Sequence, residues 1–304
     1  MIGAWTMGEA RQRKLQAAKE SASTGPKPWP LSNPDIQRDL EAWFTRIGVD
    51  PTRPGIHDTP EFLHAEARYP DALNKVAHLV EARTYTEVEL AQAERKILVA
   101  AEAVARRVAQ DGRPGLCVVA SGVLSRMLDE LEVWNYTAKS NLTVTFPSEI
   151  SRSPRYFYSV DSGDFAAAHA VVVAPPFVVI DVTVRQQSYE TAAMGQYLPA
   201  IASTKDYKPY QVTADQLISP EFRENLQMRR LSPDAYLTQR KPEMLELMRH
   251  LPSRQVSLEN GSLGYGIVAV TGYQERLSEM QGEFISIDGL TPQQIFEQDV
   301  LPRL

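Results

Sequence analysis

Cys117 is the only cysteine in a chain of 304 residues, and it stands where a thiol could act as a nucleophile. It follows the turn-forming run Gly112-Arg113-Pro114-Gly115 and opens the apolar-periodic segment LCVVASGVLSRMLDEL, which predicts a helix. The first turn of a helix offers free backbone N–H groups and the positive end of the dipole, and both favour a thiolate. A free cysteine is also often a small buried hydrophobic residue, so a chemical role for Cys117 requires partners.

His169 and Asp181 are the candidate partners, and both lie in the segment AAHAVVVAPPFVVIDVTV. Its two apolar runs, separated by Pro175-Pro176, predict two adjacent strands that are buried on both faces. Adjacent strands can place a histidine near the start of one beside an aspartate on the other. An unpaired buried carboxylate is strongly unfavourable, so each of the two is the nearest candidate partner for the other.

Together, the three residues supply the groups of a nucleophilic triad. A thiolate attacks a carbonyl carbon to form a thioester, while histidine takes the thiol proton and returns a proton to the leaving group. Aspartate fixes the tautomer of histidine and stabilises the imidazolium. Backbone N–H groups at Cys117 and its neighbour could donate to the oxyanion. The side-chain amides that could add a donor, or could be ordinary loop or surface amides, belong to Gln186, Gln187, Asn135 and Asn141.

This order of cysteine helix, histidine strand and aspartate strand resembles the transglutaminase-like cysteine enzymes, which include arylamine N-acetyltransferases, transglutaminases and related proteases and deamidases. The matching segments are Gly115-Leu116-Cys117, His169-Ala170-Val171-Val172 and Val179-Ile180-Asp181-Val182-Thr183. The resemblance covers roughly residues 95–190 and implies an α+β fold of the transglutaminase-like, papain-like superfamily, with the nucleophile helix packed on an antiparallel sheet. It implies Cys117 as nucleophile, His169 as base and acid, and Asp181 as the residue that orients the histidine.

Two classes of function remain open on these residues. The first is a cysteine hydrolase or acyltransferase that cleaves a peptide or amide, deamidates glutamine or transfers an acyl group to an amine. Its substrate would be a protein, a peptide or a small amide or acyl compound. The second is a non-catalytic binding protein that carries a degenerate site on the same fold. A papain-type protease ranks lower, because it usually has asparagine where Asp181 stands and its cysteine usually lies much nearer the mature N-terminus.

Composition indicates the class of protein, its compartment and its partners. The hydrophobic fraction of 43% and charged fraction of 23% are ordinary for a globular protein, and no apolar stretch is long enough to predict a membrane span. A single cysteine cannot form an intramolecular disulfide and fits a reducing compartment, so we expect a cytoplasmic protein. The net charge of −6 argues against nucleic-acid binding except through a basic N-terminal arm. We expect no cofactor and no metal. The zinc-binding motif HExxH is absent, and a metal site formed by His57 and His64 is a weak alternative.

Pattern and breaker residues divide the chain into four regions. Residues 1–30 form a basic arm, 31–110 a helical region, 111–213 the transglutaminase-like core, and 214–304 a helical and β extension packed on it. We expect a long helix from about residue 86 to 110 and a meander of about four strands over 133–184. Two strands are predicted in the last region, one at residues 264–271 (GYGIVAVT) and one at residues 284–287. The tyrosines between 189 and 210 could bind substrate or pack on the core.

Overall fold

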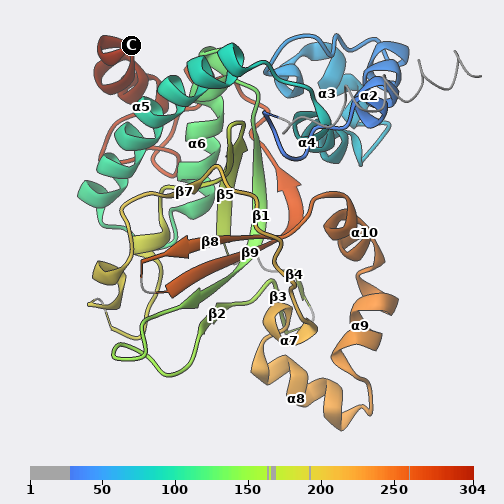
Figure 1. The fold of residues 1–304 in the computed structure, drawn as a ribbon, viewed down its shortest axis with the longest axis vertical. Coiled ribbons are helices and arrows are strands. Elements are labelled where there is room, and N and C mark those ends of the chain that lie inside the picture. Colours follow the sequence, from blue (N-terminus) through green and yellow to red (C-terminus); the bar gives the residue numbers. More distant parts are fainter. Residues whose placement is uncertain (1–27, 163, 166–168, 192, 260) are drawn as a thin grey trace, which may run out of the picture.

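The structure is a computed structural model and describes residues 28–162, 164–165, 169–191, 193–259 and 261–304. It has an α+β architecture around an antiparallel sheet that is nearly barrel-shaped, with the strand order β7–β6–β5–β1–β9–β8 and β2 paired with β1 (Figure 1). The strands are β1 (Tyr136–Thr145), β2 (Arg155–Phe157), β5 (His169–Ala174), β6 (Phe177–Asp181), β7 (Ala202–Thr204), β8 (Arg254–Leu258) and β9 (Gly261–Thr271), beside a hairpin of β3 (Val160–Asp161) and β4 (Asp164–Phe165).

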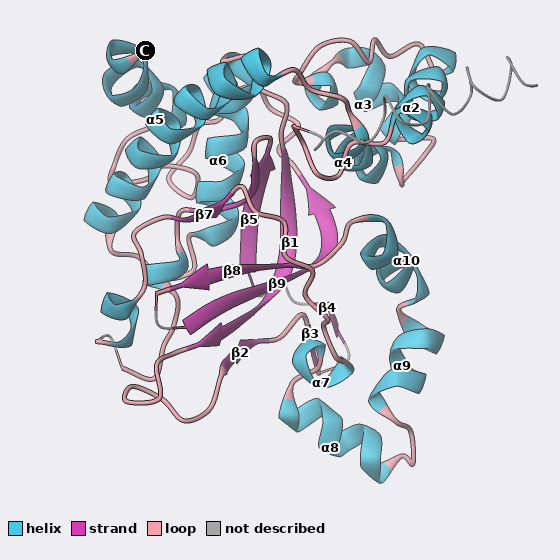
Figure 2. Cartoon of the chain, in the orientation of Figure 1, coloured by secondary structure: helices cyan, strands magenta, loops and turns pink. Residues whose placement is uncertain are grey.

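Helices surround this sheet in three groups (Figure 2). The pair that lies along one side is α5 (Glu87–Asp111) and α6 (Cys117–Glu130). The second group is α2 (Pro34–Arg46), α3 (Pro60–Glu66) and α4 (Ala72–Ala82), and the third is α7 (Ala214–Leu217), α8 (Pro220–Met228), α9 (Pro233–Arg240) and α10 (Pro242–His250). A short α11 (Pro292–Ile295) follows near the C-terminus. The helix expected at about residues 86–110 is confirmed by α5, which begins after a capping box at Thr86 and ends at Asp111, with Gly112 as its C-cap.

The cysteine helix packs on one face of the sheet, as expected. Leu124, Met127 and Leu128 of α6 lie in one buried cluster with Val172 and Ile180 of the two strands beneath it. Because side chains alternate along a strand, the neighbours of these strand residues point to the opposite face. The same packing sets α6 directly against β5, the strand that begins at His169.

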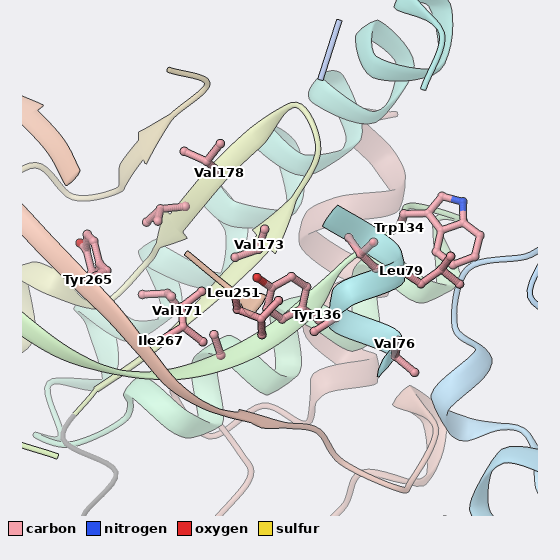
Figure 3. Close-up of a cluster of buried hydrophobic side chains, with 14 of the residues drawn as sticks. Val76, Leu79, Trp134, Tyr136, Val171, Val173, Val178, Leu251, Tyr265 and Ile267 are labelled. Atoms are coloured by element: carbon pink, nitrogen blue, oxygen red, sulfur yellow. The ribbon is translucent and has the colours of Figure 1, made fainter. Parts of the chain in front are cut away.

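The opposite face of the strands encloses a second cluster inside the curled sheet. Val171 and Val173 of β5 meet Tyr136 of β1 and Tyr265 and Ile267 of β9 there, all of them buried. Figure 3 shows Tyr265, Val171 and Ile267 at one end of this cluster, with Trp134 and Val76 at the other. Long-range pairing builds this interior, since β1 lies between β5 and β9 and pairs with both.

A buried ion pair helps to join β8, at one edge of the curled sheet, to β6, which lies next to the other edge. Arg254 of β8 and Glu81 of α4 are 0% and 4% exposed at their side chains, and Arg254 Nη2 lies 2.5 Å from Glu81 Oε1. Arg254 Nη1 also donates to the carbonyl of Val178 on β6 at 2.7 Å, and the hydroxyl of Tyr136 donates to Glu81. Trp29 donates its indole N–H to the Glu81 carbonyl at 2.7 Å. The pair and its hydrogen bonds therefore link the edge strand β8, the strand β6 and the covering helix α4.

Several sequence-based expectations need correction. The predicted meander over residues 133–184 is wrong as a pairing order, because β1 pairs with β5 and β9 as well as with β2. The predicted strand at residues 284–287 is also wrong, since the segment turns and only Ile287 forms an isolated bridge, with Leu290. The sheet itself takes strands from both sides of residue 213, because β8 and β9 follow that position.

The tyrosines between residues 189 and 210 are mostly packing residues. Tyr189 and Tyr207 pack against the interior cluster, and the ring of Tyr210 lies so close to Gly264 that a Cβ there would meet it at 2.4 Å. Tyr197 is 58% exposed and is the one of the four that faces solvent. Most of the predicted arm, residues 1–27, lies outside the described residues, whereas Trp29 is buried.

Substitution of Arg254 by methionine should lower the free energy of unfolding by about 3–5 kcal/mol, because it leaves the carboxylate of Glu81 buried without its countercharge. Denaturant unfolding measures this loss. The control is Arg38→Met, which breaks an ion pair to Asp35 whose side chains are 70% and 83% exposed, and we expect little change there. Equal effects of the two substitutions would contradict the structural role given to Arg254.

Candidate active site

Cys117 is the first residue of α6, as the breaker run before it predicts. Gly112 ends α5 with φ 70°, and Gly115 has φ 77°, so two left-handed turns reverse the chain just before the cysteine. The N-cap position is Leu116, whose side chain makes no capping hydrogen bond. The backbone N–H groups of the first turn therefore have no side-chain cap. The thiol itself is 5% exposed.

His169 and Asp181 form the pair that the two apolar runs predict. His169 opens β5 and Asp181 ends β6, and these strands are antiparallel neighbours. His169 Nε2 lies 2.6 Å from Asp181 Oδ2, and both side chains are fully buried. The predicted pairing of the two side chains is therefore confirmed. It satisfies a carboxylate whose burial without a partner would be strongly unfavourable.

The thiol of Cys117 reaches the same imidazole. It is close enough to be one of the groups that raise the pKa of His169, while the ring nitrogen Nδ1 makes no hydrogen bond among the described residues. Since Nε2 is engaged by Asp181, Nδ1 is the nitrogen left to exchange a proton with sulfur. A loose contact of this kind is common between a nucleophile and its base before substrate binds.

The protonation of His169 is set by opposing effects. Burial alone lowers the pKa of His169, but the charge of Asp181, their hydrogen bond and the nearby thiol outweigh burial and raise the pKa to about 10. The ring therefore carries its proton at neutral pH. A protonated imidazole beside a sulfur atom stabilises negative charge on that sulfur.

Asp181 is surrounded by donors on both oxygens. Oδ1 accepts the backbone N–H of Thr183 at 2.9 Å and its hydroxyl at 3.3 Å. Oδ2 accepts the hydroxyl of Tyr265 at 2.9 Å in addition to His169. Neither of these extra donors is among the site residues predicted from sequence. Thr183 had a local signal, because a hydroxyl two residues after an aspartate often closes an Asx-type turn, whereas Tyr265 had none.

Most of the amides considered for the oxyanion serve the fold instead. Asn135 donates to Asp129 and to the carbonyl of Val133, Asn141 donates to the carbonyl of Gln216, and Gln187 donates to the carbonyl of Thr183. Asn141 also accepts the backbone N–H of Gly266 at 3.0 Å. These contacts give each of the three amides a structural partner, which leaves Gln186 as the amide of this set without a described one.

Two buried oxygens in the segments around the triad make no hydrogen bond among the described residues. One is Oγ of Ser140, which lies opposite His169 in the pairing of β1 with β5, and the other is Oε1 of Gln186. Unpaired buried polar atoms cost about 1–3 kcal/mol each and tend to occur at functional sites. Atoms of the same kind also occur in other segments, for example Oγ of Ser159 and Nε of Arg223.

His57 belongs to a different buried cluster, at the other end of α6. Its Nε2 lies 3.4 Å from Oδ2 of Asp129, and Nη1 of Arg126 lies 3.1 Å from the same oxygen. Burial and the charge of Arg126 lower the pKa of His57 to about 3, and burial raises the pKa of Asp129 to about 7. Cavities of about 680 and 590 Å³ border Asp129. Within the described ranges, no group of three or more metal-ligating side chains forms, around His57, His64 or elsewhere.

Comparison with known proteins adds no relative: no family model, curated protein or solved structure matches this chain. The described helices include none that is both long and apolar enough to span a membrane.

The raised pKa of His169 predicts a specific pH dependence of stability. The folded pKa of about 10 lies above the unfolded value of about 6.5, so the stabilisation is fully present below about pH 6.5. It is lost progressively as the pH rises from there through about 10. Unfolding free energies measured across this window should fall in the wild type, and Asp181→Asn should remove most of that slope. A parallel slope in both proteins would contradict the assigned pairing.

Proposed function

We propose that this protein is a cysteine-nucleophile acyl-transfer enzyme with a transglutaminase-like core, in which Cys117, His169 and Asp181 form the catalytic triad. One observation carries the proposal: the imidazole of His169 is contacted both by a carboxylate from the neighbouring strand and by a thiol from the start of a helix. His169 Nε2 lies 2.6 Å from Asp181 Oδ2, while the thiol of Cys117 reaches the same ring. The order of these residues along the chain agrees with the resemblance to transglutaminase-like enzymes.

The proposed reaction begins from an ion pair, in which the thiol proton of Cys117 has already passed to Nδ1 of His169 and the sulfur is a thiolate. The sulfur of Cys117 attacks the carbonyl carbon of an amide, and the C–N bond breaks as His169 returns the proton to the leaving amine. The resulting thioester is then attacked by water or by an amine, which loses a proton to His169. The C–S bond breaks, and the departing thiolate restores the starting ion pair with protonated His169. Asp181 remains an anion throughout and holds the imidazole in place.

The uncapped start of α6 suits the oxyanion of this reaction. Leu116 offers no capping oxygen, so the N–H groups of Cys117 and Val118 are not engaged by a side-chain cap. An oxygen that becomes negative beside the sulfur would accept them and take the place of the missing cap. One such donor is typically worth about 3–4 kcal/mol of activation free energy. The uncapped N–H groups at the start of α6 thus support the chemistry proposed.

A binding protein with a degenerate site is the second candidate, and one observation favours it. Cys117 is 5% exposed, and His169 and Asp181 are 0% exposed. An acyl substrate must reach the sulfur atom, so an enzyme requires an approach to Cys117 that a purely structural triad does not.

Alkylation of the native protein with iodoacetamide separates the two candidates, because the lone cysteine makes labelling unambiguous. In the enzyme, Cys117 should react rapidly well below the usual thiol pKa of about 8.5 and should lose this reactivity in His169→Ala. The exposed His64→Ala serves as the control and should leave labelling unchanged. A thiol that reacts only after the protein unfolds would favour the binding protein.

Turnover tests the orienting role of Asp181. With a panel of activated esters and amides, mass spectrometry should detect a thioester on Cys117 that is absent from Cys117→Ala. Asp181→Asn should slow formation of this thioester on the order of 10⁴-fold, because it favours the wrong histidine tautomer. An Asp181→Asn protein that folds and reacts at the wild-type rate would show that Asp181 does not orient the base.

A further inference from the structure

We propose that Tyr265 is a positioning residue of the triad, which fixes the Asp181 carboxylate so that it holds His169 in the reactive orientation. The inference rests on the proposed function and adds to it a residue from β9, a strand that is adjacent to neither β5 nor β6 in the sheet. Tyr265 lies on β9, in the region after residue 213, and pairs with Leu142 of β1 rather than with either triad strand. It is fully buried.

Tyr265 contacts both members of the pair that it would position. Its hydroxyl donates to Oδ2 of Asp181 at 2.9 Å, the same oxygen that lies 2.6 Å from His169 Nε2. Its ring stacks on the imidazole of His169, with centroids 6.2 Å apart and an interplanar angle of 29°. The hydroxyl thus fixes the carboxylate, while the ring limits rotation of the imidazole.

The four hydrogen bonds that Asp181 accepts explain why the hydroxyl of Tyr265 matters. An ionised carboxylate offers about four acceptor positions. Thr183 supplies two donors to Oδ1, and His169 and Tyr265 supply one each to Oδ2. All four positions are filled, so rotation or protonation of the carboxylate would break an existing hydrogen bond. Nε2 of His169 is held as the donor to Asp181, and Nδ1 is left to face the thiol.

Tyr265 can act only as a donor in this arrangement. Burial and then the charge of Asp181 raise the pKa of Tyr265 well above its usual value, so the phenol keeps its proton. A buried tyrosine with a purely structural role would need only some acceptor for its hydroxyl. The choice of the catalytic carboxylate as that acceptor is what points to positioning.

The test compares Tyr265→Phe with Tyr85→Phe. Tyr85 is a matched control, because it is also buried and its hydroxyl donates at 2.8 Å to the carbonyl of Val80, outside the triad. Both substitutions remove one buried hydrogen bond and keep the ring. NMR titration of the His169 ring and the rate of thioester formation are measured for each, together with denaturant unfolding.

We expect Tyr265→Phe to slow thioester formation about 10–100-fold, by analogy with the loss seen when the hydrogen-bond partner of a metal-ligating side chain is removed. The pKa of His169 should rise, because Asp181 loses a donor that shares its negative charge, whereas Tyr85→Phe should change neither quantity. If the two variants match in rate and in the pKa of His169, Tyr265 is structural and the proposal falls.

A second variant covers the case in which Tyr265→Phe does not fold. Thr183→Val removes a hydroxyl donor from the other oxygen of Asp181 and should shift the pKa of His169 in the same direction. An unchanged pKa would overturn the argument from the filled donor set. The NMR readout needs no activity, so it reports on positioning even if iodoacetamide labelling and thioester formation show that the proposed function is wrong.

Discussion

The carboxylate of Asp181 is the group on which the arrangement of this protein depends. A fully buried negative charge is tolerated only when hydrogen bonds and a countercharge replace the water that it has lost. Here the replacements come from β5, from the turn after β6 and from β9. Because these three segments must meet at one carboxylate, strand pairing, sheet curvature and the orientation of the imidazole are coupled, and a displacement of any strand would leave the charge unsatisfied.

Local patterns predicted the parts of the site that lie on single elements. The breaker run before Cys117 and the apolar period after it place a helix start, and the two apolar runs that carry His169 and Asp181 place adjacent strands. Each of these signals depends on neighbours within a few residues. The meeting of histidine with aspartate also follows from sequence, because burial of either one alone is unfavourable.

The contact of Tyr265 with Asp181 and the order of the strands could not be predicted from such local patterns. GYGIVAVT predicts a strand, but nothing local indicates that this strand pairs with β1 or that its tyrosine reaches Asp181. The same limit applies to the four-strand meander, which assumed that neighbours in sequence are neighbours in the sheet. Asn135 and Asn141 looked like free amides because their partners, Asp129 and Gly266, could be identified only in three dimensions.

The placement of β9 between β1 and β8 has a consequence for synthesis of the chain. During translation, β1 emerges long before the strand that completes one of its sides, so its open edge must wait for the C-terminal third of the protein. Pairing between such distant segments slows folding. The thiol, imidazole and carboxylate can therefore all leave the ribosome without their final surroundings, and a partly made chain should lack any nucleophilic reactivity that depends on them.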